Sequence, residues 1–194
     1  MNLQYDTYIV SPGYESHKHF SGLHADTRLR LFVTALAFKK DKTKKIIVSG
    51  GKIRKMKKSF AELKKDELIK NLNIPAEVIE TEEETFDTSS QIIWIKNNIE
   101  KLGSSIAFIT DPFQAKHVQI LLNSYNLPNV KVLTVDKILF ELDPENFHFY
   151  TNLYNSIYGY IWRVREFLIT QFTKFFDPKG KIIQKITRYR LPKN

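Results

Sequence analysis

The sequence predicts an α/β protein built on a Rossmann-like, mostly parallel sheet with helices on both of its faces. Short apolar runs alternate along the chain with segments whose apolar residues recur at helical spacing. The runs at residues 46–48 and 106–109 are apolar throughout, which is typical of strands buried on both faces of a parallel sheet. Right-handed crossovers between such strands place helices on both faces.

Each element in the first half of the chain has its own signal. Residues 5–10 form a predicted strand that ends in a turn containing Pro12 and Gly13. Asp26 fits the N-cap of a helix with an apolar stripe along residues 29–36. After the strand at residues 46–48, Ser59 and Glu62 have the spacing of a capping box, which predicts a helix that ends near residue 71.

The alternation continues in the second half of the chain. A strand at residues 77–80 leads into an acidic turn, and a helix from Thr88 runs until Gly103 stops it. Residues 106–110 form the next buried strand, a helix follows near residues 118–125, and residues 130–135 form the last strand. We therefore expect a Rossmann-like domain at residues 1–140.

Residues 141–194 are expected to form a helical extension that packs on the same domain. The stretch from Phe147 to Phe176 is dense in aromatic residues, and most of the rings are expected to cover the edge of the sheet. A homodimer contact or a peripheral contact with a membrane surface stays open for the excess. Residues 181–186 fit either a final edge strand or a helical turn.

Composition excludes several classes of protein. The chain has 194 residues and no cysteine, which excludes a disulfide framework and a thiolate nucleophile. The N-terminus lacks the pattern of a secretory signal and no apolar run is long enough to span a bilayer, so a soluble, cytoplasmic protein is expected. The net charge of +9 favours anionic partners without specifying one, and no motif indicates specific nucleic-acid binding.

Three polar turns each follow a predicted strand, and together they predict one binding pocket. Ligands of open α/β sheets bind outside the carboxyl ends of the strands. The first turn is Ser49, Gly50 and Gly51, whose backbone amides could hold a phosphate or a carboxylate. The alternative for this turn is a tight bend that needs glycine for its backbone conformation. It matches neither a Walker loop nor the three-glycine dinucleotide fingerprint.

The second turn is acidic and lies directly before a predicted helix. Glu82, Thr85, Asp87 and Thr88 could cap helix amides, hold a metal or supply a general base. Capping accounts for Asp87 or Thr88 but not for the whole cluster. A solvated run of charges is the alternative for Glu82.

The third turn runs from Thr110 through Asp111, Phe113 and Gln114 into a helix that carries His117. Pro112 presets the first helical turn, so the amides after it are expected to face the pocket. His117 could be a general base, and the alternative is a residue that packs against a neighbouring helix.

Three further histidines, His17, His19 and His24, lie in the loop after the first strand. Their spacing fits no standard zinc pattern, so no metal site is predicted. A metal could bind there only with help from Asp26 or the acidic turn. The sequence does not name a cofactor.

These three turns resemble those of the YdcF/SanA/ElyC-like bacterial family, a domain of unknown function. The resemblance covers roughly residues 5–135, and its most specific part is Glu82, Thr85, Asp87 and Thr88 in the spacing Glu-x-x-Ser/Thr-x-Asp/Asn-Thr. It implies a Rossmann-like fold and a link to cell-envelope metabolism. It also implies an arginine at the start of the first helix, for which we prefer Arg28 over Arg30.

The chain departs from the family pattern in the third turn. Asp111 replaces a serine, Gln114 replaces a histidine and His117 replaces an arginine. Two interpretations follow: a changed ligand, or a member that binds its ligand without turnover. The membrane helix that precedes the domain in envelope members is not seen in this sequence.

The function expected from the sequence is binding of an anionic small molecule, such as a nucleotide, a nucleotide-sugar or another phosphorylated metabolite, with hydrolase or transferase activity left open. The candidate catalytic residues are Glu82, Asp87 and His117. The candidate ligand-binding residues are Ser11, Gly13, Arg28, Ser49, Gly50, Gly51, Thr85, Thr88, Thr110, Asp111, Phe113 and Gln114. The alternative function is non-enzymatic docking of the aromatic, basic C-terminal segment to an acidic partner or a membrane surface.

Overall fold

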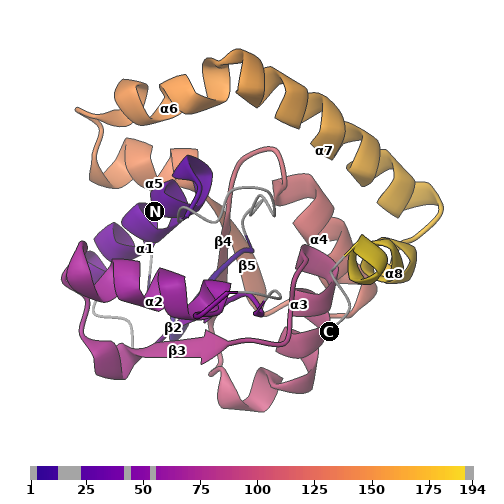
Figure 1. Ribbon diagram of the computed structural model, residues 1–194, viewed down its shortest axis with the longest axis horizontal. Helices are drawn as coiled ribbons and strands as arrows, with labels where there is room; N and C mark the ends of the chain where they lie inside the picture. The colour runs from indigo at the N-terminus through magenta and orange to yellow at the C-terminus, as the bar shows by residue number, and fades with distance from the viewer. Residues whose placement is uncertain (1–3, 13–22, 42–44, 53–55, 191–194) are drawn as a thin grey trace.

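The computed structural model describes residues 4–12, 23–41, 45–52 and 56–190 and contains a five-stranded parallel sheet (Figure 1). The strands are β1 (Thr7–Val10), β2 (Lys45–Ser49), β3 (Ile79–Glu82), β4 (Ile106–Thr110) and β5 (Val130–Thr134). Their order in the sheet is β3-β2-β1-β4-β5, and every neighbouring pair is parallel. The predicted Rossmann-like fold class is therefore confirmed.

Helices cover both faces of this sheet. Helices α1 (Ala25–Asp41), α2 (Phe60–Lys70) and α5 (Val135–Leu142) contribute to one apolar core, which contains Tyr8 and Val10 of β1. Helices α3 (Thr88–Asn97) and α4 (Ala115–Ser124) pack on the opposite face, where Ile9 points. Successive residues of β1 thus enter opposite cores, which is why the predicted strands are apolar throughout.

The predicted starts of α2 and α3 are confirmed by their caps, whereas Asp26, expected as an N-cap, lies inside the first turn of α1, which begins at Ala25. Ser59 accepts a hydrogen bond from the Glu62 amide and Glu62 accepts one from the Ser59 amide, so α2 begins with a complete capping box. Asp87 caps α3 in the same way with Ser90. Strand β3 begins later than the sequence indicates, because residues 76–78 form a short 3-10 turn after Pro75.

Three helices follow α5 and arch over one side of the molecule (Figure 1). These are α6 (Phe147–Asn155), α7 (Ile157–Phe175) and α8 (Lys181–Arg190). Helix α7 packs against α6 and α4, while α8 packs against α3. Residues 181–190 are helical rather than a strand, because the Asp177 carboxylate accepts hydrogen bonds from the amides of residues 181, 182 and 183 and so caps α8.

The expectation that most C-terminal aromatic rings are buried is wrong. Tyr154 and Trp162 are buried, but most of the rings whose burial is described between residues 157 and 176 are exposed. The physical reason is that, apart from Trp162, the inward positions of α7 are occupied by small or polar residues. They are Gly159, Glu166, Thr170 and Thr173. Among the described residues, no helix is long and apolar enough to cross a membrane.

Candidate functional site

The strand order places a topological switch point between β1 and β4 at the carboxyl edge of the sheet. The chain goes from β1 outward through β2 to β3 and then returns to β4 on the other side of β1. The connections that leave β1 and β4 therefore diverge, and such a switch point is where open α/β sheets bind ligands. Ser11 follows β1 at this point and Asp111 follows β4, and both are fully buried.

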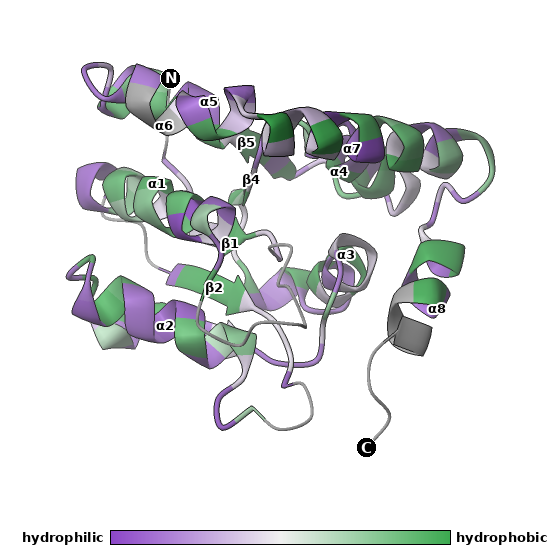
Figure 2. Ribbon diagram, turned by 45° about the horizontal axis from the view of Figure 1, so that its top comes forward, coloured by the Kyte–Doolittle hydropathy of each residue, from purple (hydrophilic) through white to green (hydrophobic). Residues whose placement is uncertain are grey.

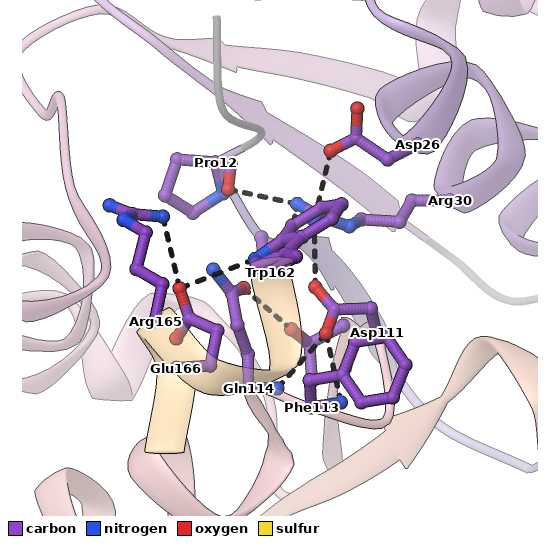
Figure 3. A network of polar contacts seen from close by, with 11 residues as sticks. Pro12, Asp26, Arg30, Asp111, Phe113, Gln114, Trp162, Arg165 and Glu166 are labelled. Atoms are coloured by element: carbon purple, nitrogen blue, oxygen red, sulfur yellow. Dashed lines mark hydrogen bonds and ion pairs between the residues drawn. The ribbon is translucent and has the colours of Figure 1, made fainter. Parts of the chain in front are cut away.

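The side chain of Arg30, from the second turn of α1, lies at this switch point (Figure 3). Its Nη1 donates hydrogen bonds of 2.9 Å to the Ser11 hydroxyl and to the Pro12 carbonyl oxygen. Its Nη2 lies 2.9 Å from Asp111 Oδ2 and 3.2 Å from Asp26 Oδ2. The guanidinium has no exposed surface, and a cation is buried at such cost only where partners compensate it.

The buried arginine is Arg30 and not Arg28, which sequence reasoning preferred. Arg28 is exposed, because it lies two residues earlier and so on another side of α1. The spacing of Asp26 and Arg30, four residues apart, is the signal that could have identified the buried arginine.

Asp111 links Arg30 to the start of α4. Its Oδ1 accepts hydrogen bonds from the amides of Phe113, at 2.9 Å, and Gln114, at 3.0 Å. The amides expected to face a ligand are thus bound by a carboxylate of the chain itself. Burial raises the pKa of Asp111, and this effect exceeds the opposing effect of Arg30.

A second buried charged group near Arg30 is Glu166 of α7 (Figure 3). The Trp162 indole donates a hydrogen bond of 3.3 Å to Glu166 Oε1, and Arg165 Nη1 lies 3.1 Å from the same oxygen. Burial raises the pKa of Glu166, while Arg165, the Trp162 indole and the Gln114 side chain lower it. Gln114 in turn accepts a hydrogen bond of 3.0 Å from the Thr110 hydroxyl.

We call the connected group Ser11, Asp26, Arg30, Asp111, Gln114 and Glu166 the buried polar layer. It lies between the carboxyl edge of the sheet and α7 (Figure 3). Trp162 closes it on the α7 side, with the Arg30 Cζ atom 5.7 Å from the centroid of its ring. Protein interiors at such a boundary are usually apolar, so this concentration of charge requires a structural or functional reason.

His117 is buried in the first turn of α4, a helix that packs against α7. It is 4% exposed, and its Nε2 has no hydrogen-bond partner among the described residues. Burial and, to a smaller extent, the charge of Arg165 lower its pKa to about 4, while Asp177 opposes the change. The imidazole is therefore neutral at pH 7, as a general base must be.

Three more polar atoms near the ends of β4 and β5 lack partners within the described part of the chain. They are the Tyr154 hydroxyl, Thr134 Oγ1 and Asp136 Oδ1. Burial and the nearby Asp111 carboxylate raise the pKa of Tyr154, so its phenol keeps its proton. Sequence reasoning missed all three, because their relation to Asp111 depends on how α5 and α6 fold back over the sheet. Unsatisfied buried groups of this kind are consistent with a bound water or ligand.

The Ser49-Gly51 turn is built differently from the expected anion nest. The Gly50 amide donates to the Glu82 carbonyl oxygen at 2.9 Å, and the Gly51 amide donates to the Thr85 carbonyl oxygen at 3.0 Å. Gly50 has a φ of +143°, and a Cβ on Gly51 would lie 2.1 Å from the Phe86 ring. The glycines are therefore needed for a tight bend and for close packing, which is the alternative that the sequence left open.

The acidic turn is likewise occupied by its own contacts. Glu82 accepts hydrogen bonds from the amides of Glu84 and Thr85 and from the Thr85 hydroxyl. Asp87 caps α3, and Thr88, the first residue of that helix, is buried. These side chains shape the end of β3 and do not contact the buried polar layer through any hydrogen bond that the structure describes.

Ser49 is tied to the neighbouring strand ends. Gln91 Nε2 donates to the Ser49 hydroxyl at 2.5 Å and to the Val10 carbonyl oxygen at 3.0 Å, and thus joins β2 to β1. The buried Lys64 ammonium donates to the Ser49 carbonyl oxygen at 2.8 Å. Neither Lys64 nor Gln91 was expected, because the helical pattern alone does not show which polar residue turns toward the sheet.

The remaining predicted site residues fall into two groups. Phe113 packs edge-on against Tyr154, with ring centroids 5.3 Å apart, and the Arg163 guanidinium lies 5.0 Å from its ring centroid. Gly13, His17 and His19 lie outside the described residues. Within the described ranges, no group of three or more histidine, aspartate or glutamate side chains could hold a metal ion.

No family model, curated protein or solved structure matches this chain. Its function is therefore inferred from its own geometry.

Proposed function

We propose that this protein binds a small anionic metabolite, such as a nucleotide, a nucleotide-sugar or another phosphorylated compound, at the carboxyl edge of its sheet beneath α7. Arg30 is the anchoring cation. The observation that carries the proposal is the buried polar layer, which places a fully buried guanidinium at the switch point of the sheet.

The balance of charges in the buried polar layer supports the replacement of one of its carboxylates by an anionic ligand. Arg30 is shared by Asp26 and Asp111, so one cation faces two carboxylates. An anionic group that replaces one of them at Arg30 Nη2 leaves the guanidinium paired. The contact with Asp26 is the longer of the two, and Asp111 is held in addition by two amides. Asp26 is therefore the carboxylate that we expect to leave.

The inward face of α7 also supports a polar ligand. Glu166, Thr170 and Thr173 turn toward the sheet although apolar side chains are abundant on this helix. Such a face is poorly suited to permanent packing and well suited to a polar molecule. We infer that α7 acts as the cover of the site and moves away from the strand edge when ligand binds.

Any turnover would use Glu166 and His117 rather than the acidic turn. The pKa of Glu166 is raised, which suits a proton donor near neutral pH. His117 is neutral at pH 7 and could accept a proton, but its lowered pKa makes it a weak base. Glu82 and Asp87 are committed to turn and helix caps. The link to cell-envelope metabolism implied by the family resemblance stays a proposal.

A thermal-shift comparison tests the binding function. We expect a nucleoside diphosphate or a sugar phosphate to raise the Tm of the protein in a concentration-dependent way, whereas the matching unphosphorylated nucleoside or sugar leaves it unchanged. At a hundred times its Kd, a ligand adds about 2.7 kcal/mol to the free energy of unfolding. Absence of any shift across both phosphorylated classes would contradict the proposal.

Two variants locate the binding site. Arg30→Lys keeps a cation but loses the fork that pairs with two anions, so it should abolish the ligand-induced shift. Arg28→Lys is the matched control on the exposed side of α1 and should keep the shift. If both variants respond as the unaltered protein does, the ligand binds elsewhere.

A further inference from the structure

Most of the large apolar side chains of helix α7 are turned outward, while Glu166, Thr170 and Thr173 are buried on its inner side. Its exposed positions include Ile161, Phe167 and Phe175, which are 62%, 60% and 65% exposed. We define the apolar outer face as the following exposed residues on α7 and directly after it: Ile157, Tyr160, Ile161, Val164, Phe167, Leu168, Phe172, Phe175 and Phe176. Figure 2 shows hydrophobic residues along α7 and on the adjoining α8.

This arrangement is the reverse of a surface helix in a water-soluble domain, where the apolar stripe faces the core. The outer face repeats at intervals of three and four residues, so it forms a continuous strip along the helix. Contiguous apolar surface of this extent marks a binding site for a partner or a membrane. Ile182 and Ile186 add exposed apolar side chains on α8.

The charges on this segment are all of one sign at the surface. Residues 157–186 contain two acidic residues, Glu166 and Asp177, and both are buried. The same segment contains six basic residues, and all of them are exposed. They are Arg163, Arg165, Lys174, Lys179, Lys181 and Lys185. The partner of the outer face is therefore expected to be negatively charged.

An anionic bilayer fits these features better than a second copy of the chain. Two copies that met through the outer face would bring six cations of each chain together, and interface cores are depleted of charge. In contrast, lysine and arginine beside an apolar strip extend toward lipid phosphates while the apolar residues enter the acyl region. At 1.5 Å per residue, the 19 residues of α7 extend over about 28 Å in the plane of the membrane.

We propose that the apolar outer face of α7, together with α8, docks this protein on the surface of an anionic lipid bilayer. The docking is peripheral: α7 lies along the interface with its inner face still turned toward the sheet. Each exposed lysine near the surface contributes about a fivefold increase in affinity, and the exposed phenylalanine rings contribute the apolar part.

Vesicle sedimentation tests the proposal with defined lipids. The protein should sediment with vesicles of phosphatidylcholine and phosphatidylglycerol in equal parts and stay in solution with pure phosphatidylcholine. Phe167→Gln/Phe175→Gln should weaken binding about tenfold or more. Lys181→Glu/Lys185→Glu should weaken it by at least about 25-fold, because it removes two cations and adds two anions, and added salt should weaken binding further.

Matched controls separate the outer face from general effects. Phe140, on α5, is 68% exposed, so Phe140→Gln removes an equally exposed ring away from α7 and α8. Lys131→Glu reverses an exposed charge on β5. Both controls should bind vesicles as the unaltered protein does. Circular dichroism should show all variants folded, because the altered side chains are exposed.

Three results would overturn the proposal. One is failure to bind anionic vesicles, and another is equal binding to neutral vesicles. The third is a dimer in light scattering that Phe167→Gln/Phe175→Gln dissociates while vesicles fail to bind, which would assign the face to a second copy of the chain. None of these results affects the phosphorylated-ligand shift, so this proposal and the proposed function fail independently.

Discussion

The Arg30 guanidinium lies 5.7 Å from the centroid of the Trp162 ring, and this contact joins the first helix of the domain to the arch formed by its last helices. The Trp162 indole also donates to Glu166, so one side chain touches the cation of the site and orients a carboxylate. The strand edge and α7 are coupled through this residue. A change at either one should therefore be measurable at the other.

The first prediction concerns the burial of Arg30. Arg30→Gln leaves Asp26 and Asp111 buried without their cation, so we expect it to lower the free energy of unfolding by about 3–5 kcal/mol. Arg28→Gln should change it by less than about 0.5 kcal/mol, because Arg28 is exposed. Urea unfolding measures both. Equal effects of the two substitutions would show that the buried ion pairs do not stabilise the fold.

The second prediction concerns the pH dependence caused by His117. Its pKa is lowered from 6.5 to about 4, so the unfolded chain binds this proton at a higher pH than the folded chain does. The neutral His117 side chain therefore contributes fully to the free energy of unfolding above pH 6.5. This contribution, up to about 3 kcal/mol, is lost as the pH falls toward 4. His117→Gln should flatten the loss of stability between these pH values. A pH profile identical to that of the unaltered protein would contradict the assignment.

The third prediction concerns Glu166, whose pKa is raised by burial. The folded protein holds this proton to a higher pH than the unfolded chain, so stability is lost as the pH rises through the raised pKa. Glu166→Gln removes the titrating group. Its free energy of unfolding, relative to the unaltered protein, should therefore increase as the pH rises from 4 to 7. A constant difference over this range would indicate that the carboxyl titrates normally.

The sequence predicts the order of the helices and strands, but it does not show which polar side chains point into the interior. The apolar runs at residues 46–48 and 106–109 define buried strands, and Ser59 with Glu62 defines a helix start, because these signals are local. The two carboxylate partners of Arg30 lie 4 and 81 residues away in the chain. Its burial depends on the parallel pairing of β1 with β4, which no local pattern contains.

Because local patterns do not contain long-range contacts, the sequence could not predict the role of Gly50 and Gly51 or the exposure of the aromatic segment. The pattern at Gly50 and Gly51 fits both an anion nest and a tight bend, and only the approach of Phe60 and Phe86 distinguishes them. The aromatic residues of α7 fit a core helix by composition. They are exposed because the sheet edge that α7 covers is itself polar, so the polar side of the helix faces inward.

The fourth prediction tests the packing role of Gly51. Gly51→Ala places a Cβ 2.1 Å from the Phe86 ring and 2.7 Å from the Glu83 carbonyl oxygen, so we expect a loss of about 1–3 kcal/mol in the free energy of unfolding. In the Phe86→Ala background the ring no longer opposes the new methyl group, and the loss should be smaller. A double-mutant cycle measures this coupling. Additive effects would show that the ring does not restrict the turn.

The central claim is that an anionic ligand binds at Arg30 beneath Trp162, and the emission of that tryptophan tests it most directly. The chain has two tryptophans, so Trp94→Phe leaves Trp162 as the single reporter. Titration of this variant with a nucleoside diphosphate should give a saturable change in emission, which the added Arg30→Lys substitution removes and the added Arg28→Lys substitution keeps. An unchanged emission spectrum in a titration that raises the Tm would place the ligand away from Trp162 and contradict the account.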